Sequence, residues 1–218
     1  MKTFITNIIT LSFLVLAFTG CKEKAKEAET TTAEIVETVK KVTADNYTVN
    51  IAESSIAWKG FKPTEFHNGT INLSEGRIEV TEGKVSGGTF TVDMNSIVVL
   101  DIPAEKKGNA KLVAHLKNED FFDVEKYPST TFTITKLEEK DSLTLISGNL
   151  KMKDATNNIT FPAKVTTENG IVTLVSEAFT IDRTKWGVKY KSKSILGDLA
   201  DKFIKDEIEF VVNVKAAK

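Results

Sequence analysis

From Tyr47 onward, apolar and polar residues alternate with a period of two in a series of short runs. In TFTVDM (89–94), Phe90, Val92 and Met94 share one parity, and polar residues occupy the other. Successive side chains of a strand point to opposite faces, so this pattern predicts strands with one apolar and one polar face. About eight such runs, separated by turns that often contain glycine, predict an antiparallel sandwich or barrel.

Two runs carry irregularities. In NITFPAKV (158–165), Pro162 indicates a strand edge or a bulge, because proline cannot donate to a ladder. In SLTLISGNLKM (142–152), the apolar parity changes between the first leucines and the last residues. A bulge at Gly148 would return both halves to one face, so we expect one there.

One helix interrupts the strands within residues 103–123. Leu112, Val113 and Leu116 follow helical spacing and form an apolar stripe. Asn109 is the expected N-cap. The helix must end before Tyr127, which precedes a proline and therefore avoids helical backbone.

The N-terminus has the pattern of a targeting segment. Residues 1–20 contain a lysine, a short apolar run and small residues before Cys21, which predicts a secretory signal peptide rather than a membrane-spanning anchor. FTGC, ending at Cys21, is similar to a bacterial lipobox, in which the cysteine carries the lipid anchor. Residues 21–45 are expected to form a flexible tether, with a short partner-binding helix as the alternative. Residues 46–218 are expected to form one domain.

Several functional classes receive little support. The net charge of −1 offers no basic face for nucleic acid. Two histidines and one cysteine do not supply the four nitrogen or sulfur ligands of a structural zinc site. His115 and Glu119 are four residues apart and can meet on a helix, but no nucleophile motif accompanies them. A hydrolase using His115 is therefore an alternative only, and the chain is not expected to be an enzyme.

The thirteen phenylalanines favour a large apolar interior. Many of them lie on the apolar parity of the expected strands, where simple core packing explains any one of them. A sheet that closes on itself can also enclose a cavity for a long apolar ligand. Both interpretations stay open at this point.

Four blocks and an N-terminal stretch resemble the YceI-like family in order and spacing. They are HLKNEDFFDVEKYPSTTFTIT (115–135), GNLKMKDATNNITFPAKV (148–165), FTIDRTKWGV (179–188), DEIEFVVNV (206–214) and GTINLSEGRIEVTEGKVSGGTFTVDMNSI (69–97). The resemblance covers about residues 46–216. It implies an all-β fold with one short helix, an extended antiparallel lipocalin-like barrel that binds polyisoprenoid or similar amphiphilic lipids in an apolar pore. It also implies a protein of the bacterial cell envelope, without catalytic residues.

Under this resemblance, residues 115–132 form a corner between helix and strand. Asp120 and Asp123 are expected to accept backbone N–H groups, and Phe121 or Phe122 to plug the barrel. The first strand departs from the family pattern, with Glu53 for a histidine and Trp58 for a phenylalanine, so ligand identity does not carry over. Arg183 could bind a lipid phosphate as a bidentate donor, or pair with a carboxylate such as Asp182.

Strand parity nominates the residues that would contact a ligand: Phe90, Met94, Phe132, Ile134, Phe161 and Phe210 on the inner face, with Trp58 at the mouth. The expected partners are a lipid ligand and the membrane, reached through acylated Cys21. No cofactor or metal is expected beyond that lipid. A filled barrel acting as an envelope interaction module remains the main alternative, and the oligomeric state is open.

Overall fold

The structure, a computed structural model, describes residues 24–36, 44–197 and 199–218. The predicted signal peptide and Cys21 lie outside these residues, so both stay predictions. Within the described residues, no helix is both long enough and apolar enough to cross a membrane.

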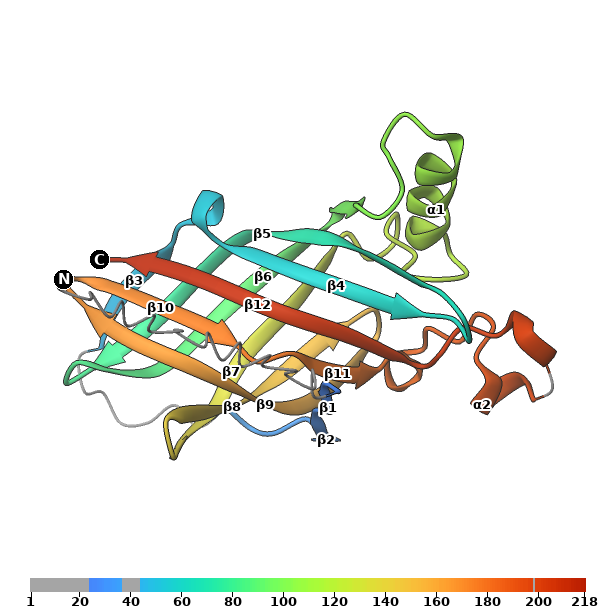
Figure 1. The fold of residues 1–218 in the computed structure, drawn as a ribbon. Coiled ribbons are helices and arrows are strands. Elements are labelled where there is room, and N and C mark those ends of the chain that lie inside the picture. Colours follow the sequence, from blue (N-terminus) through green and yellow to red (C-terminus); the bar gives the residue numbers. More distant parts are fainter. Residues whose placement is uncertain (1–23, 37–43, 198) are drawn as a thin grey trace, which may run out of the picture.

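The chain forms an elongated antiparallel β-barrel, as the sequence predicted (Figure 1). The ring closes because β12 pairs with β10 on one side and with β4 on the other. Two wall positions are occupied by successive strands: β3 and β4 both lie between β5 and β12, and β10 and β11 both pair with β12. The wall strands are β3 (Asp45–Val49), β4 (Ser55–Phe61), β5 (Phe66–Thr81), β6 (Lys84–Val99), β7 (Ser129–Lys140), β8 (Leu143–Met152), β9 (Ala155–Glu168), β10 (Ile171–Ser176), β11 (Phe179–Asp182) and β12 (Glu207–Ala217).

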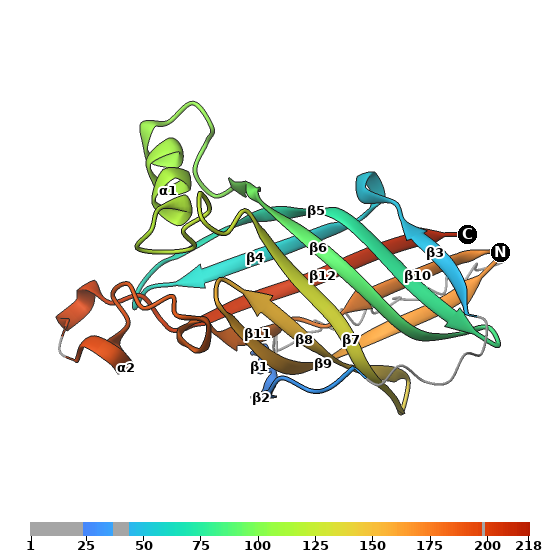
Figure 2. The ribbon, with the colours of Figure 1, turned by 180° about the vertical axis from the view of Figure 1, so that it is seen from behind.

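Tight turns join the strands at the end of the barrel near the C-terminus. Glu82 and Gly83 connect β5 to β6 with φ values of 52° and 78°. Asn169 and Gly170 connect β9 to β10 with φ values of 51° and 73°. Positive φ at both central residues is typical of the hairpin turn whose twist matches that of the flanking strands. The strands then run obliquely along the barrel, as β6 and β7 do in Figure 2.

The predicted bulge at Gly148 is wrong. The extra residue lies in the neighbouring strand β7, where the register with β8 shifts between Ile134 and Lys136. Strand β8 runs without a shift against β9, so Ile146, Leu150 and Met152 keep the inner parity and Leu145 falls on the other. The change of phase in the sequence therefore reflects leucines outside the core rather than a bent strand.

The helices lie at the opposite end of the barrel from the C-terminus (Figures 1 and 2). Helix α1 spans Lys107–Lys117 and buries Leu116, while α2 is a single turn at Lys193–Leu196. The expected N-cap at Asn109 is wrong, because the helix begins earlier, after Lys106. The Asn109 side chain instead donates to the carbonyls of Val99 (3.0 Å) and Ile102 (2.7 Å), which ties the helix to the end of β6 and to the loop between them. Short 3-10 turns are η1 (Ile51–Glu53), η2 (Arg183–Trp186) and η3 (Ala200–Lys202).

Residues 24–36, which we call the strap, differ from the flexible tether that the sequence predicted. Strand β1 (Lys26–Glu27) pairs parallel with β11, and β2 (Glu29–Thr32) pairs antiparallel with β9. If the register of β9 with β10 continued, Phe179 would lie opposite Thr160; instead Phe179 pairs with Lys26, and Thr160 pairs with Glu29. The strap is thus an additional strand inserted where β9 and β11 separate.

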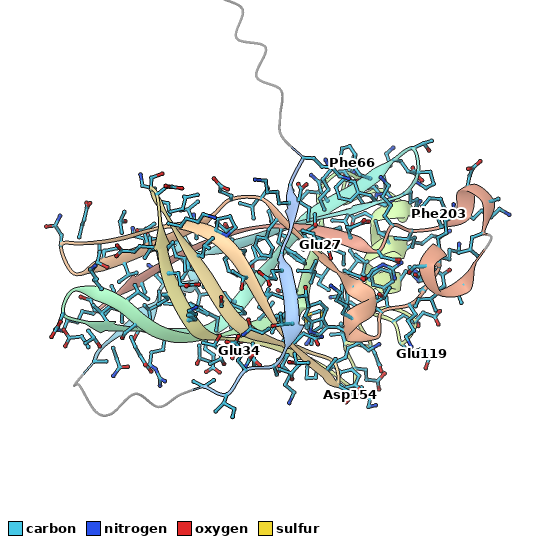
Figure 3. The ribbon with its side chains drawn as sticks, turned by 90° about the horizontal axis from the view of Figure 1, so that it is seen from below. Glu27, Glu34, Phe66, Glu119, Asp154 and Phe203 are labelled. Atoms are coloured by element: carbon cyan, nitrogen blue, oxygen red, sulfur yellow. The ribbon has the colours of Figure 1, made fainter. Side chains whose placement is uncertain are left out.

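Backbone and side-chain hydrogen bonds hold both halves of the strap, which carries Glu27 and Glu34 in Figure 3, to the wall. Ala28 is buried among the core residues, and its N–H donates to the carbonyl of Thr180 at 2.8 Å. Further along, the Glu34 backbone exchanges hydrogen bonds with the Asn149 side chain at 2.9 and 2.7 Å. Thr135 donates to the Glu34 carboxylate at 3.0 Å. Hydrogen bonds to neighbouring strands, rather than the strap's own apolar content, therefore order a segment that is polar in sequence.

Candidate ligand-binding cavity

Five phenylalanines from different strands form a layer across the inside of the barrel, which we call the aromatic layer. Adjacent ring centroids are 4.4 to 6.4 Å apart, within the range of favourable aromatic pairs. The layer consists, in order, of Phe90, Phe132, Phe161, Phe179 and Phe210. Strand register places these rings together: Phe90 pairs with Phe132, and Phe179 pairs with Phe210.

Two glycines in the wall leave room for aromatic side chains. A Cβ atom on Gly148 would lie 2.3 Å from the Phe132 ring, and one on Gly69 would lie 2.7 Å from the Trp58 ring. Real side chains do not approach so closely. The ring of Trp58 and that of Phe132 therefore occupy space next to positions where the wall has no side chain.

An apolar cavity of about 190 Å³ adjoins the aromatic layer. Among the described residues that line it, only Thr130, Arg183 and Lys205 have polar or charged side chains. Phe132 and Phe210 are only partly buried although they face inward, because the cavity leaves part of their surface uncovered. An apolar space of this kind is typical of sites for apolar ligands.

The structure brings most of the predicted ligand-contacting residues together. Six line the cavity: Trp58, Phe90, Met94, Phe132, Phe161 and Phe210. Ile134 is buried in the core but does not line the cavity. Phe179 lines it and was not predicted, because its strand is four residues long and shows little alternation. Whether these residues contact a ligand stays a prediction.

A second cavity, which we call the vestibule, continues from the first towards the end of the barrel that carries the helices. It has a volume of about 260 Å³ and shares five lining residues with the apolar cavity: Trp58, Gly60, Leu116, Phe121 and Ile204. Its other lining residues are Phe61, Lys62, His67, Leu112, His115, Tyr190 and Lys191. Trp58 thus lies between an apolar space and a more polar one, and its role at the mouth of a ligand site stays a prediction.

His115 lies between aromatic rings. Its imidazole centroid is 4.6 Å from that of Tyr190 and 5.8 Å from that of Phe121. No hydrogen bond joins His115 to Glu119 in the described part of the chain, so the geometry of a base oriented by an acid is not formed there. Nor do the described residues include a group of three or more His, Cys, Asp or Glu side chains able to hold a metal ion.

The corner after α1 is held together by Asn118 rather than by the predicted aspartates. The Asn118 side chain accepts a hydrogen bond from the N–H of Asp120 at 3.1 Å. The backbone carbonyl of Asn118 accepts hydrogen bonds from the N–H groups of Phe121 and Asp123. Asp123 has a φ of 50°, a backbone conformation that aspartate tolerates better than most residues. Phe121 is buried and lines both cavities, so it lies at the boundary between them, and its role as a plug of the barrel stays a prediction.

Arg183 is fully buried and is bound by the protein itself. Its guanidinium donates to the carbonyls of Val188 (2.7 Å), Lys205 (3.1 Å) and Ile204 (3.1 Å). It also donates to the carboxylate of Asp206 at 3.3 Å, whereas Asp182 instead accepts from Thr184. Burial lowers the pKa of Arg183, and Asp206 opposes that shift. Of the two expected partners for Arg183, a lipid phosphate or a protein carboxylate, the structure shows a carboxylate. It is that of Asp206 and not that of Asp182.

His67 and Asp101 form a pair that the sequence did not predict. The His67 ring and the Asp101 carboxylate are 2.8 Å apart, and the same carboxylate accepts the N–H of Asn68 at 2.8 Å. Partial burial works to raise the pKa of Asp101, but these hydrogen bonds outweigh it and hold that pKa below its usual value. The two residues are 34 positions apart, and no local spacing signal connects them.

Comparison with known proteins is consistent with this architecture. Over 84 residues, 30% are identical to Protein YceI of Salmonella arizonae, and the same values hold for that of Salmonella newport. This stretch covers 36% of the chain, and the chain spans 44% of the length of these curated relatives.

Solved structures share the fold at low sequence identity. Burkholderia cenocepacia BcnA has a TM-score of 0.62 at 18% identity, covering 78% of this chain and 99% of that one. A polyisoprenoid binding domain from Saccharophagus degradans has a TM-score of 0.59 at 14% identity, covering 78% and 97%. The model of the YceI-like domain matches residues 47–216, most of the chain. The protein therefore belongs to the YceI-like family.

Proposed function

We propose that this protein holds the tail of a long apolar or amphiphilic lipid, such as a polyisoprenoid, inside its barrel. The observation that carries the proposal is the apolar cavity, whose wall includes the whole aromatic layer. A tail in this space would replace water with contacts to aromatic and aliphatic side chains, at about 25 cal/mol per Å² of apolar surface buried. The polyisoprenoid binding domain with the same fold adds support.

We further propose that the protein acts at the bacterial cell envelope as a lipoprotein and does not catalyse a reaction. The signal-like residues 1–20 and the cysteine that follows them support this location. Two or more acyl chains on Cys21 would give stable membrane attachment, whereas one gives only weak binding.

Mass spectrometry of the full chain from its native membrane fraction tests the bound lipid. After solvent extraction, we expect one discrete long-chain lipid in an amount comparable to that of the protein. A Phe132→Asp change should remove it, because the carboxylate would face the cavity. Thr133→Asp, on the outer face of the same strand, is the matched control and should retain it. Wild-type protein that carries no long-chain lipid from its own host would contradict the proposal.

Metabolic labelling tests the anchor separately. An alkyne-tagged fatty acid should label the full chain, and Cys21→Ser should abolish both the label and recovery in the membrane fraction. Labelling that survives the Cys21→Ser change would contradict attachment at this residue.

A further inference from the structure

Among the described residues, the Lys, Arg, Asp and Glu side chains that line the two cavities are all positively charged ones. Lys62 and Lys191 line the vestibule, and Arg183 and Lys205 line the apolar cavity. Among the described residues, no Asp or Glu lines either space. The chain holds 29 Lys and Arg against 30 Asp and Glu, so composition alone does not account for this selection.

Two of these cations are not neutralised by a carboxylate. Within the described ranges, neither Lys191 nor Lys205 forms an ion pair. The ammonium group of Lys191 lies 5.3 Å from the centroid of the Tyr190 ring, and that of Lys205 lies 5.8 Å from the centroid of the Phe61 ring. Both are therefore able to approach an anion without breaking an existing salt bridge.

Lys62 is paired, but weakly. Its ammonium lies 2.6 Å from the Glu65 carboxylate, and the two side chains are 40% and 57% exposed. An exposed pair of this kind contributes little stability and exchanges readily. Arg183, by contrast, donates its hydrogen bonds to backbone carbonyls and to Asp206. It therefore contributes positive charge without being free to contact a ligand.

The vestibule lies where a head group would emerge. It continues from the apolar cavity through Trp58, Phe121 and Ile204, which line both spaces. A molecule whose tail occupies the apolar cavity would therefore place its polar end beside Lys62 and Lys191. His115 and Tyr190 line the same space, and both side chains carry groups that can donate hydrogen bonds.

The geometry points to the vestibule as a binding site for an anionic head group, a phosphate or a carboxylate, carried by a long apolar tail. This inference rests on the proposed lipid-binding function and specifies its ligand class. Lysine ammonium groups suit such anions as point charges, and partial enclosure strengthens the interaction relative to open water.

Matched probe pairs test the inference on the full-length protein, purified from membranes in mild detergent and extracted to remove any lipid that it carries. Farnesyl phosphate and farnesol share a tail and differ in the phosphate; palmitate and hexadecanol make the same comparison for a carboxylate. Mass spectrometry of the intact complexes should show the anionic member of at least one pair binding about tenfold more tightly, equivalent to about 1.4 kcal/mol. Which pair shows the larger ratio identifies the head group. Added salt should weaken the anionic probe and leave its neutral counterpart unchanged.

Charge-removing variants locate the effect. The double change Lys62→Gln and Lys191→Gln should reduce the ratio to about twofold or less, with binding of the neutral probe retained. The matched control, Lys84→Gln with Lys218→Gln, removes two exposed lysines near the other end of the barrel and should retain the preference (Figure 1).

Each remaining outcome overturns a defined claim. Equal binding of the anionic and neutral probes by wild-type protein, or a preference that survives the vestibule variant, overturns the anionic head-group site and leaves the lipid-binding function standing. Failure of all four probes to bind overturns the lipid-binding function and the head-group site with it.

Discussion

The edge of strand β9 that faces away from β8 is paired in two different ways along its length. Its C-terminal part pairs directly with β10 at six successive positions, from Ala163 to Glu168. Its N-terminal part, Asn157 to Thr160, pairs with the strap instead. The change occurs at Pro162, which has no N–H to donate and whose carbonyl accepts the last hydrogen bond from the β10 side, that of Glu177.

This difference shows that one part of the barrel wall is completed by strands of the family domain, and another part by the strap. The directly paired part belongs to the matched family domain, residues 47–216, whereas the strap precedes that domain. The separated strands nevertheless carry cavity-lining residues, among them Ile159, Phe161, Phe179 and Ile181. A segment outside the family domain therefore covers the side of the cavity.

The largest effect is expected in the wall of the family domain itself, at Gly148 of β8. Gly148→Val should lower the free energy of unfolding by about 3 kcal/mol or more, because the new side chain would overlap the Phe132 ring and the Thr133 carbonyl. Gly60→Val is the control, since its Cβ would have no atom within 4 Å, and it should change stability by less than about 1 kcal/mol. Urea denaturation compares the two variants, and equal losses would show that the wall at Gly148 can move aside.

Deletion of residues 24–36 should have a smaller and more local effect. We expect a loss of about 2 kcal/mol, because strap hydrogen bonds of about 1 kcal/mol each are offset by the entropy that the strap regains. Amide hydrogen exchange should accelerate at 157–160 and 179–182 and stay unchanged at 163–168. Uniform acceleration over β9 would mean that the strap stabilises the whole barrel rather than one opening in its side.

A charge at the buried strap position should release the strap without removing it. Ala28→Asp would bury an unpaired carboxylate, which costs several kcal/mol and outweighs what the strap contributes, so the strap should detach and give the exchange pattern of the deletion. Thr31→Asp, at an exposed position of β2, should leave the strap in place. Protection of 157–160 that persists in Ala28→Asp would show that Ala28 does not control the strap.

The smallest effect is expected at the end of the strap. Glu34→Ala removes the carboxylate that accepts from Thr135, but retains the backbone hydrogen bonds with Asn149. It should cost about 0.5 kcal/mol, typical of an exposed polar contact. The exposed Glu29 provides the control, and a Glu29→Ala change with an equal or larger cost would rule out a specific contribution from the Glu34 carboxylate.

The sequence predicted the barrel because its signal is repeated in every strand. Parity alone placed Phe90, Phe132 and Phe161 on the inner face, since a strand cannot show two successive side chains to one side. The strap was missed because its Glu and Thr residues carry no apolar alternation, and its order comes from strands more than a hundred residues away. The bulge was assigned to Gly148 on parity alone, whereas the glycine serves the ring of Phe132.

The vestibule was equally beyond sequence reasoning. Lys62, His115 and Lys191 come from a strand turn, a helix and a loop that no spacing rule connects, and only the closed barrel brings them together. Residues that meet only through the tertiary fold leave no pattern in any short stretch of the sequence. Aromatic parity, by contrast, is visible in any single strand.

The pairing of β12 with β4 also sets when the chain can fold. The backbone N–H of Lys215 donates to the side chain of Ser54, 161 residues earlier. Ring closure must therefore wait until nearly the whole chain is present, and contacts of such high contact order form slowly. Until then the inner faces of the strands are exposed to other chains, so nascent molecules are most prone to aggregation before the last strand arrives.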